Sequence, residues 1–189
     1  MTIENVRDAL PDYARDLKLN LGSVLTTNGA PGLNEKQIWS IALATAIAAR
    51  NTSFARIVEA ESRAHLSDKD IEGAKSAAAI MGMNNIYYRF LHLVEDGEYQ
   101  TMPARLRMNV IANHGIDKLD FELISLAVSA VNGCGLCITS HEKKLRQHEV
   151  SRESIQSAVR IAATIHAVAG VAEFERSAPV AAGSTELAA

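Results

Sequence analysis

The pattern S-x-x-x-I-x-x-A-x-x-x-A-A occurs twice in this chain, at Ser67–Ala79 and at Ser151–Ala163, with an offset of 84 positions. Apolar residues spaced by three and four positions share one face of an α-helix, and alanine lets helices pack closely. We find no sustained alternation of apolar and polar positions rich in β-branched residues, as strands would have. The sequence therefore predicts an all-α protein.

The repetition has two explanations. Alanine-rich amphipathic helices can align by chance, or the chain contains a duplicated helical unit packed about a pseudo-twofold axis. In the second case, the 84-residue offset places Cys134 and Cys137 opposite Arg50 and Ser53. The first half would then be scaffold, and only the second half would carry chemistry.

Turn and capping residues divide the chain into helices. The loop TNGAPGLN, residues 27–34, ends at Asn34, a residue type that caps helix N-termini. Ser67 and Asp70 have the spacing of a capping box. Near the N-terminus, a further helix is expected to have apolar positions at Tyr13, Leu17 and Leu21.

The length of 189 residues suits one domain with a sizeable core. We expect a single all-helical domain over residues 1–176. Residues 177–189, SAPVAAGSTELAA, have no usable periodicity and are expected to form a flexible tail.

Charge and hydropathy restrict the surroundings of the protein. The net charge of -3, with basic residues scattered in short pairs such as Lys143–Lys144, gives no reason to expect nucleic acid or an anionic membrane. The N-terminal MTIENVRDAL lacks the apolar run of a signal peptide. The longest apolar-looking stretch, Ser40–Ala49, is far shorter than the roughly 20 residues of a membrane span. We therefore expect a cytoplasmic protein, in which an isolated cysteine pair is not a structural staple.

Both cysteines of the chain lie in NGCGLCITSHE, residues 132–142. If a helix begins after Asn132–Gly133, Cys134 lies at its N-terminus, where the helix dipole favours a thiolate. The spacing of three places both sulfurs on one face, and His141 lies one turn after Cys137, within reach of its sulfur. This arrangement is typical of a redox-active dithiol with an imidazole that moves protons.

Glu122 is the candidate third member of this group. If the chain reverses at Asn132–Gly133, residues equally far from the turn face each other, and Glu122 is level with His141 to within one residue. A carboxylate there could orient the imidazole. The spacing equally allows Glu122 to be a first-turn acid that complements the dipole of its own helix.

Other interpretations of the motif are weaker. A zinc site would need a fourth ligand, such as His114 or His148, and the chain has no second C-x-x-C. The c-type haem signature requires a histidine directly after the second cysteine. An inert, buried cysteine pair also remains open.

Several runs of the sequence are similar to those of the alkyl hydroperoxide reductase D (AhpD) family, within the carboxymuconolactone-decarboxylase-like superfamily. They are FELISLAVSAVNGCGLCITSHEKKLR, MGMNNIYYR, LRMNVIANHGI and DALPDYARDLKLNL, and the resemblance covers nearly the whole chain up to about Arg176. It implies an all-helical bundle that forms a homotrimer. It also implies an antioxidant, thiol-dependent alkyl hydroperoxidase that reduces a partner AhpC-type peroxiredoxin with electrons from a dihydrolipoyl protein, without a bound cofactor.

The resemblance also assigns roles to residues. Cys137 matches the cysteine that reacts with peroxide and forms a sulfenic acid. Cys134 matches the more exposed cysteine, which donates a proton, resolves the sulfenic acid and forms the mixed disulfide with the partner. His141 and Glu122 match the proton relay, which favours the orienting role for Glu122. One departure is Leu136, where some members of the family have a second relay histidine.

Two alternative functions remain open on this fold. The first is a pure thiol–disulfide electron adaptor without significant peroxidase activity. The second is an enzyme or binding protein of the carboxymuconolactone-decarboxylase type, whose activity would survive loss of both cysteines. Fold alone cannot separate them, because function depends on the site.

Overall fold

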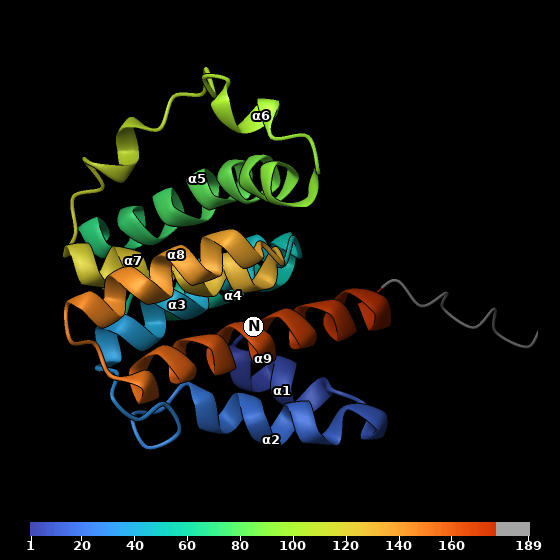
Figure 1. Cartoon of the computed structure of the whole chain (residues 1–189). Helices are drawn as coiled ribbons and strands as arrows, with labels where there is room; N and C mark the ends of the chain where they lie inside the picture. Colours follow the sequence, from blue (N-terminus) through green and yellow to red (C-terminus); the bar gives the residue numbers. More distant parts are fainter. Residues whose placement is uncertain (177–189) are drawn as a thin grey trace, which may run out of the picture.

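A computed structural model describes residues 1–176, and every regular element in that range is a helix. The all-α prediction is therefore confirmed for the described residues (Figure 1). The predicted tail, residues 177–189, lies outside them. The elements in chain order are α1 (Ile3–Ala9), η1 (Asp12–Ala14), α2 (Arg15–Val24), α3 (Glu35–Ala48), α4 (Thr52–Ser62), α5 (Asp68–Leu93), α6 (Glu98–Thr101), η2 (Asn109–Ile111), α7 (Lys118–Val131), α8 (Gly135–Gln147) and α9 (Arg152–Arg176).

Helices α3 and α7 form the centre of the bundle. They pack against each other, and both contact α5 on one side and α9 on the other (Figure 1). The apolar stretch Ser40–Ala49, which forms most of α3, explains why this helix is central, because residues 41–46 have no exposed surface. On α7, residues 120–129 are all buried as well, although a few keep a small exposed surface. Small side chains such as Ala42, Ala44 and Ala127 let the helices approach closely.

The two halves of the chain have corresponding helices. α3, α4 and α5 are matched in order and in starting position by α7, α8 and α9. The N-caps Asn34 and Asp117 are 83 residues apart, whereas Ser67 and Ser151, which precede α5 and α9, are 84 residues apart. The helix boundaries thus favour a duplicated unit over a chance alignment.

The 84-residue offset is wrong for the cysteines, because the second half has one extra residue between the start of α8 and Ser151. Cys134 corresponds to Asn51 rather than to Arg50, and Cys137 corresponds to Phe54 rather than to Ser53. Asn51 and Cys134 are both N-caps with nearly equal backbone angles. Each accepts a hydrogen bond from the backbone N–H three residues later.

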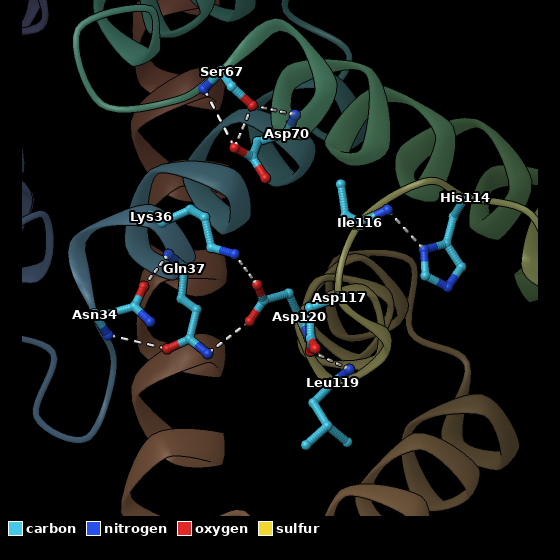
Figure 2. Close-up of polar contacts among 10 residues, drawn as sticks. All are labelled: Asn34, Lys36, Gln37, Ser67, Asp70, His114, Ile116, Asp117, Leu119 and Asp120. Atoms are coloured by element: carbon cyan, nitrogen blue, oxygen red, sulfur yellow. Dashed lines mark hydrogen bonds and ion pairs between the residues drawn. The ribbon is translucent and has the colours of Figure 1, made fainter.

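The N-termini of α3 and α7 lie side by side and are joined by Asp120 (Figure 2). The buried Asp120 carboxylate accepts a hydrogen bond from Gln37 Nε2 at 2.8 Å and pairs with Lys36 Nζ at 2.6 Å. Gln37 also completes the capping box of Asn34. This contact fixes the position of α7, which carries Glu122.

We expect Asp120→Ala to lower the free energy of unfolding by about 1–3 kcal/mol, because it removes the buried carboxylate that accepts from the partly buried Lys36 and Gln37 side chains. Urea unfolding at neutral pH measures this loss. Asp68→Ala is the matched control, because Asp68 also lies in the first turn of a helix and pairs with a cation, Arg63, but its side chain is 96% exposed. An equally small loss in both variants would contradict the structural role of Asp120.

Two expectations from the sequence are wrong. Tyr13 is exposed rather than apolar core, and its hydroxyl donates a hydrogen bond to Glu175 at 2.6 Å. Among residues 1–176, α9 alone is long and apolar enough to cross a membrane, so Ser40–Ala49 is not the stretch closest to a membrane span. Its contacts with α2, α3 and α7, and the complete burial of Ile161 and Ile165, are those of a core helix, so its composition is weak evidence for a span.

Candidate active site

The turn between α7 and α8 positions both cysteines. Gly133 has a φ of 67°, a left-handed conformation that glycine adopts without steric cost. The turn is fixed to α5, because Arg89 donates a 2.6 Å hydrogen bond to the Asn132 carbonyl and the Asn132 side chain donates one to Asn85. The N–H of Cys134 is bonded to the Ser129 carbonyl. The predicted chain reversal at Asn132–Gly133 is therefore confirmed.

The two cysteines form a disulfide in this structure. Cys134 is the N-cap of α8, and Cys137 lies in the first turn, so that the Cys134 sulfur accepts a hydrogen bond from the Cys137 N–H at 3.3 Å. Cys134 has no exposed surface, whereas Cys137 is 7% exposed. The expectation that Cys134 is the more exposed cysteine is therefore wrong for this structure, because Cys134 caps α8 in a turn that Arg89 and Asn85 hold against α5.

His141 and Glu122 lie in contact, as the antiparallel arrangement of α7 and α8 predicts. His141 Nδ1 is 2.7 Å from Glu122 Oε2, and the carboxylate is almost completely buried. The dipole of α7 does not explain this position, because the carboxylate points to α8 rather than capping its own helix.

Lys144 is a third member of this group that sequence reasoning missed. Its Nζ donates to Glu122 Oε1, so both carboxylate oxygens have a cationic or imidazole partner. Burial opposes ionisation of Glu122, but the hydrogen bonds and charges of His141 and Lys144 outweigh it and lower the pKa of Glu122 below its usual range. The spacing could have shown this, because Lys144 lies three residues after His141 on the same face of α8.

Cys137, His141 and Glu122 line a common cavity of about 420 Å³. Much of its wall is apolar or aromatic and comes from α5, α7 and the 3-10 helix η2, whereas Cys134 is not a lining residue. The other lining residues are Met81, Asn84, Tyr88, Met108, Ile111, Phe121, Leu136 and Ser140. The disulfide therefore borders the cavity on its Cys137 side.

Leu136 stands at the rim of this cavity, where it is 41% exposed. A histidine at this position would bring a second imidazole between the cysteines. With leucine, His141 is the imidazole that lines the cavity. Within residues 1–176, no three histidine, cysteine or acidic side chains gather in a geometry that would hold a metal ion.

Comparison with known proteins extends the resemblance. Residues 97–178 match the Carboxymuconolactone decarboxylase family. The chain is 53% identical over its whole length to the full-length "Alkyl hydroperoxide reductase AhpD" of Rhodospirillum centenum. It is 56% identical to the protein of that name from Gluconacetobacter diazotrophicus (89% of this chain, 91% of the relative) and 54% identical to that from Streptomyces coelicolor (89% and 93%). The chain therefore belongs to the AhpD family of alkyl hydroperoxide reductases.

Proposed function

We propose that this protein is an alkyl hydroperoxide reductase in which Cys137 and Cys134 cycle between dithiol and disulfide. The observation that carries the proposal is the Cys137 sulfur at the wall of a largely apolar cavity that also contains the His141–Glu122 pair. An apolar cavity suits the organic part of a hydroperoxide. The names of the relatives support the same activity.

In the first step, the Cys137 thiolate attacks the terminal oxygen of the hydroperoxide. An S–O bond forms, the O–O bond breaks, and the leaving alkoxide takes up a proton to become an alcohol. The Cys134 sulfur then attacks the Cys137 sulfenic acid, water leaves, and the disulfide forms. A dithiol returns two electrons and two protons by thiol–disulfide exchange.

His141 transfers the protons of these steps, and Glu122 supports the imidazole. Because Glu122 engages Nδ1, the other ring nitrogen of His141 is available to the cavity. The imidazole takes the proton of the Cys137 thiol and returns it to the alkoxide. Glu122 holds the ring in position and stabilises its charged form, as in other histidine–carboxylate pairs. Because Leu136 replaces the second histidine, this single relay serves both proton transfers.

The natural reductant in this proposal is the dihydrolipoyl group of a carrier protein, and the protein also reduces an AhpC-type peroxiredoxin. Both exchanges involve a mixed disulfide with Cys134. Because the Cys134 sulfur has no exposed surface here, the turn at residues 132–134 must shift before a partner thiolate can reach it. The protein acts in the cytoplasm and needs no bound cofactor.

The protein also forms a homotrimer in this proposal. Large apolar side chains are exposed on the last turns of α5 and on the segment that follows, where a subunit contact would cover them. They are Ile86, Phe90, Leu93, Tyr99, Met102 and Leu106. Light scattering coupled to size-exclusion chromatography measures the mass of the assembly, and a monomer at micromolar concentration would contradict the trimer.

A single-turnover experiment tests the proposed activity. The reduced protein, freed of reductant, is mixed with one equivalent of cumene hydroperoxide, and alcohol formation and intact mass are followed together. We expect one equivalent of alcohol and a mass loss of two hydrogens, since the disulfide forms within the chain. Intact peroxide with unchanged protein would favour the electron-adaptor alternative. Activity on a carboxymuconolactone that survives loss of both cysteines would favour the decarboxylase-type alternative.

A further inference from the structure

We infer that Asn84 is the residue that holds the hydroperoxide group against Cys137, an inference that rests on the proposed function. Asn84 lies on α5, is 4% exposed and lines the cavity that contains Cys137 and His141. Its Oδ1 is buried and has no hydrogen-bond partner within residues 1–176. Ser125 Oγ, on α7, is the other buried side-chain nitrogen or oxygen atom of that range without a hydrogen-bond partner.

The neighbouring Asn85 shows what a structural asparagine looks like in this helix. Its Nδ2 donates to Ser129 Oγ at 2.9 Å, and its Oδ1 accepts from Asn132 Nδ2 at 2.9 Å. Asn85 thus joins α5 to α7 and to the cysteine turn with both ends of its amide. Asn84 makes no comparable bond through its oxygen, although burying an unsatisfied carbonyl is unfavourable. A polar group retained under these conditions is expected to have a partner that is absent from the protein itself.

The cavity indicates what that partner is. Of its other polar groups, Glu122 is occupied by His141 and Lys144, and the Tyr88 hydroxyl lies 3.8 Å from Met108 Sδ. Ser140 also lines the cavity but is exposed to solvent, unlike Asn84. The carboxamide of Asn84 therefore has spare bonding capacity in a largely apolar space beside Cys137. A hydroperoxide with an organic substituent has the complementary form, because it combines an apolar body with one O–H donor and two acceptor oxygens.

The chemistry uses both ends of the amide. Asn84 Oδ1 accepts the hydrogen of the terminal O–H, and that hydrogen stays with its oxygen when the oxygen is transferred to the Cys137 sulfur. Asn84 Nδ2 donates to the second oxygen, on which negative charge develops as the O–O bond breaks. A donor aimed at developing charge stabilises the transition state more than the ground state. The proton that completes the alcohol comes from His141.

Helical spacing explains how the sequence provides this group. Met81, Asn84 and Tyr88 are separated by three and four residues, so one face of α5 presents all of them to the cavity. In the sequence, the run MNNIYY reads as an apolar stretch with two equivalent asparagines. Only the structure distinguishes the asparagine that is satisfied from the one that is not.

Asn84→Leu tests the inference, with Asn85→Leu as the matched comparison. We expect Asn84→Leu to lower kcat/KM for cumene hydroperoxide by roughly tenfold or more, since one hydrogen bond to a charged group is lost. A fall in kcat shows that the bond strengthens in the transition state. The Tm of Asn84→Leu is expected to stay unchanged or rise, and dithiothreitol should reduce its disulfide at the wild-type rate. Asn85→Leu is expected to lower Tm, because it breaks two satisfied hydrogen bonds.

Two results would overturn the inference. One is wild-type kcat/KM in Asn84→Leu. The other is a loss of activity that accompanies a lower Tm and slower disulfide reduction, as in Asn85→Leu, since that result indicates a structural role. The failure of the proposed function is a separate outcome, in which the wild-type protein forms no alcohol. In that case, titration of Cys137→Ser with cumene hydroperoxide, with and without Asn84→Leu, decides the inference, and equal affinities refute it.

Discussion

Cys137→Ser should abolish hydroperoxide turnover, with a loss on the order of a thousandfold or more, as is found when an enzyme loses its nucleophile. The serine hydroxyl is not ionised near neutral pH and has no comparable nucleophilicity toward a peroxide oxygen. Among the two sulfurs, Cys137 is the one that lines the cavity and shares it with His141. Steady-state alcohol formation with dithiothreitol as reductant measures the effect.

Cys134→Ser is the control that assigns the two roles. This variant keeps the nucleophile in its cavity, so it should produce one equivalent of alcohol and then stop with a sulfenic acid on Cys137. A sulfenic-acid reagent such as dimedone should then add once to the protein, and peptide mass spectrometry locates the adduct. If Cys134→Ser fails in the first turnover while Cys137→Ser succeeds, the two roles are reversed.

The contact between Glu122 and His141 could be predicted because it depends on local rules. Asn132–Gly133 marks a turn, the flanking helices have regular periods, and residues equally far from a turn meet across an antiparallel pair. Lys144, one helical turn after His141 on the same face of α8, was predictable by the same reasoning. The start of α3 after Asn34 and that of α5 after Ser67 were likewise predictable, because capping residues act on their own helix.

The remaining features depend on contacts between distant segments. The burial of Cys134 follows from the fixing of its turn by Arg89 and Asn85, more than 40 residues earlier. Asn84 Oδ1 has no partner because neither α7 nor the region of η2 supplies a hydrogen-bond donor to it. The offset of the repeat changes from 83 to 84 because one residue is inserted, which an ungapped alignment cannot represent. Tyr13 was predicted to be an apolar position of a helix from spacing alone, and its partner Glu175 is near the other end of the described chain.

Glu122→Gln should slow hydroperoxide reduction by about 10- to 100-fold at neutral pH, because it removes the negative charge that stabilises the protonated His141 ring. The substitution preserves the size of the side chain and one acceptor oxygen. The free thiols of the variant should still form the disulfide with a small oxidant, since Cys134 and Cys137 are not displaced. Stopped-flow measurement of alcohol formation separates this chemical effect from folding, which circular dichroism monitors.

Lys144→Met is the matched control, because it removes the other partner of Glu122 and keeps the carboxylate. The Lys144 ammonium is one of the groups that lower the pKa of Glu122, so its loss should raise that pKa. A carboxylate with a lowered pKa stabilises the fold above its ordinary pKa, and this contribution is lost as pH falls through the folded value. The difference in unfolding free energy between wild type and Glu122→Gln should therefore have its largest value at neutral pH and become smaller as pH falls below about 4.

The pH dependence distinguishes an electrostatic role of Glu122 from a purely structural one. If Glu122 acts through its charge, Lys144→Met should retain most activity at pH 7 and lose it at a higher pH than wild type as the solution is acidified. Glu122→Gln should lack the part of the acid limb that comes from Glu122, because its amide does not titrate. If both variants instead lose activity equally at every pH, Glu122 only fills space between α7 and α8. In that case, His141 would have to act without a carboxylate, and the relay would consist of the imidazole alone.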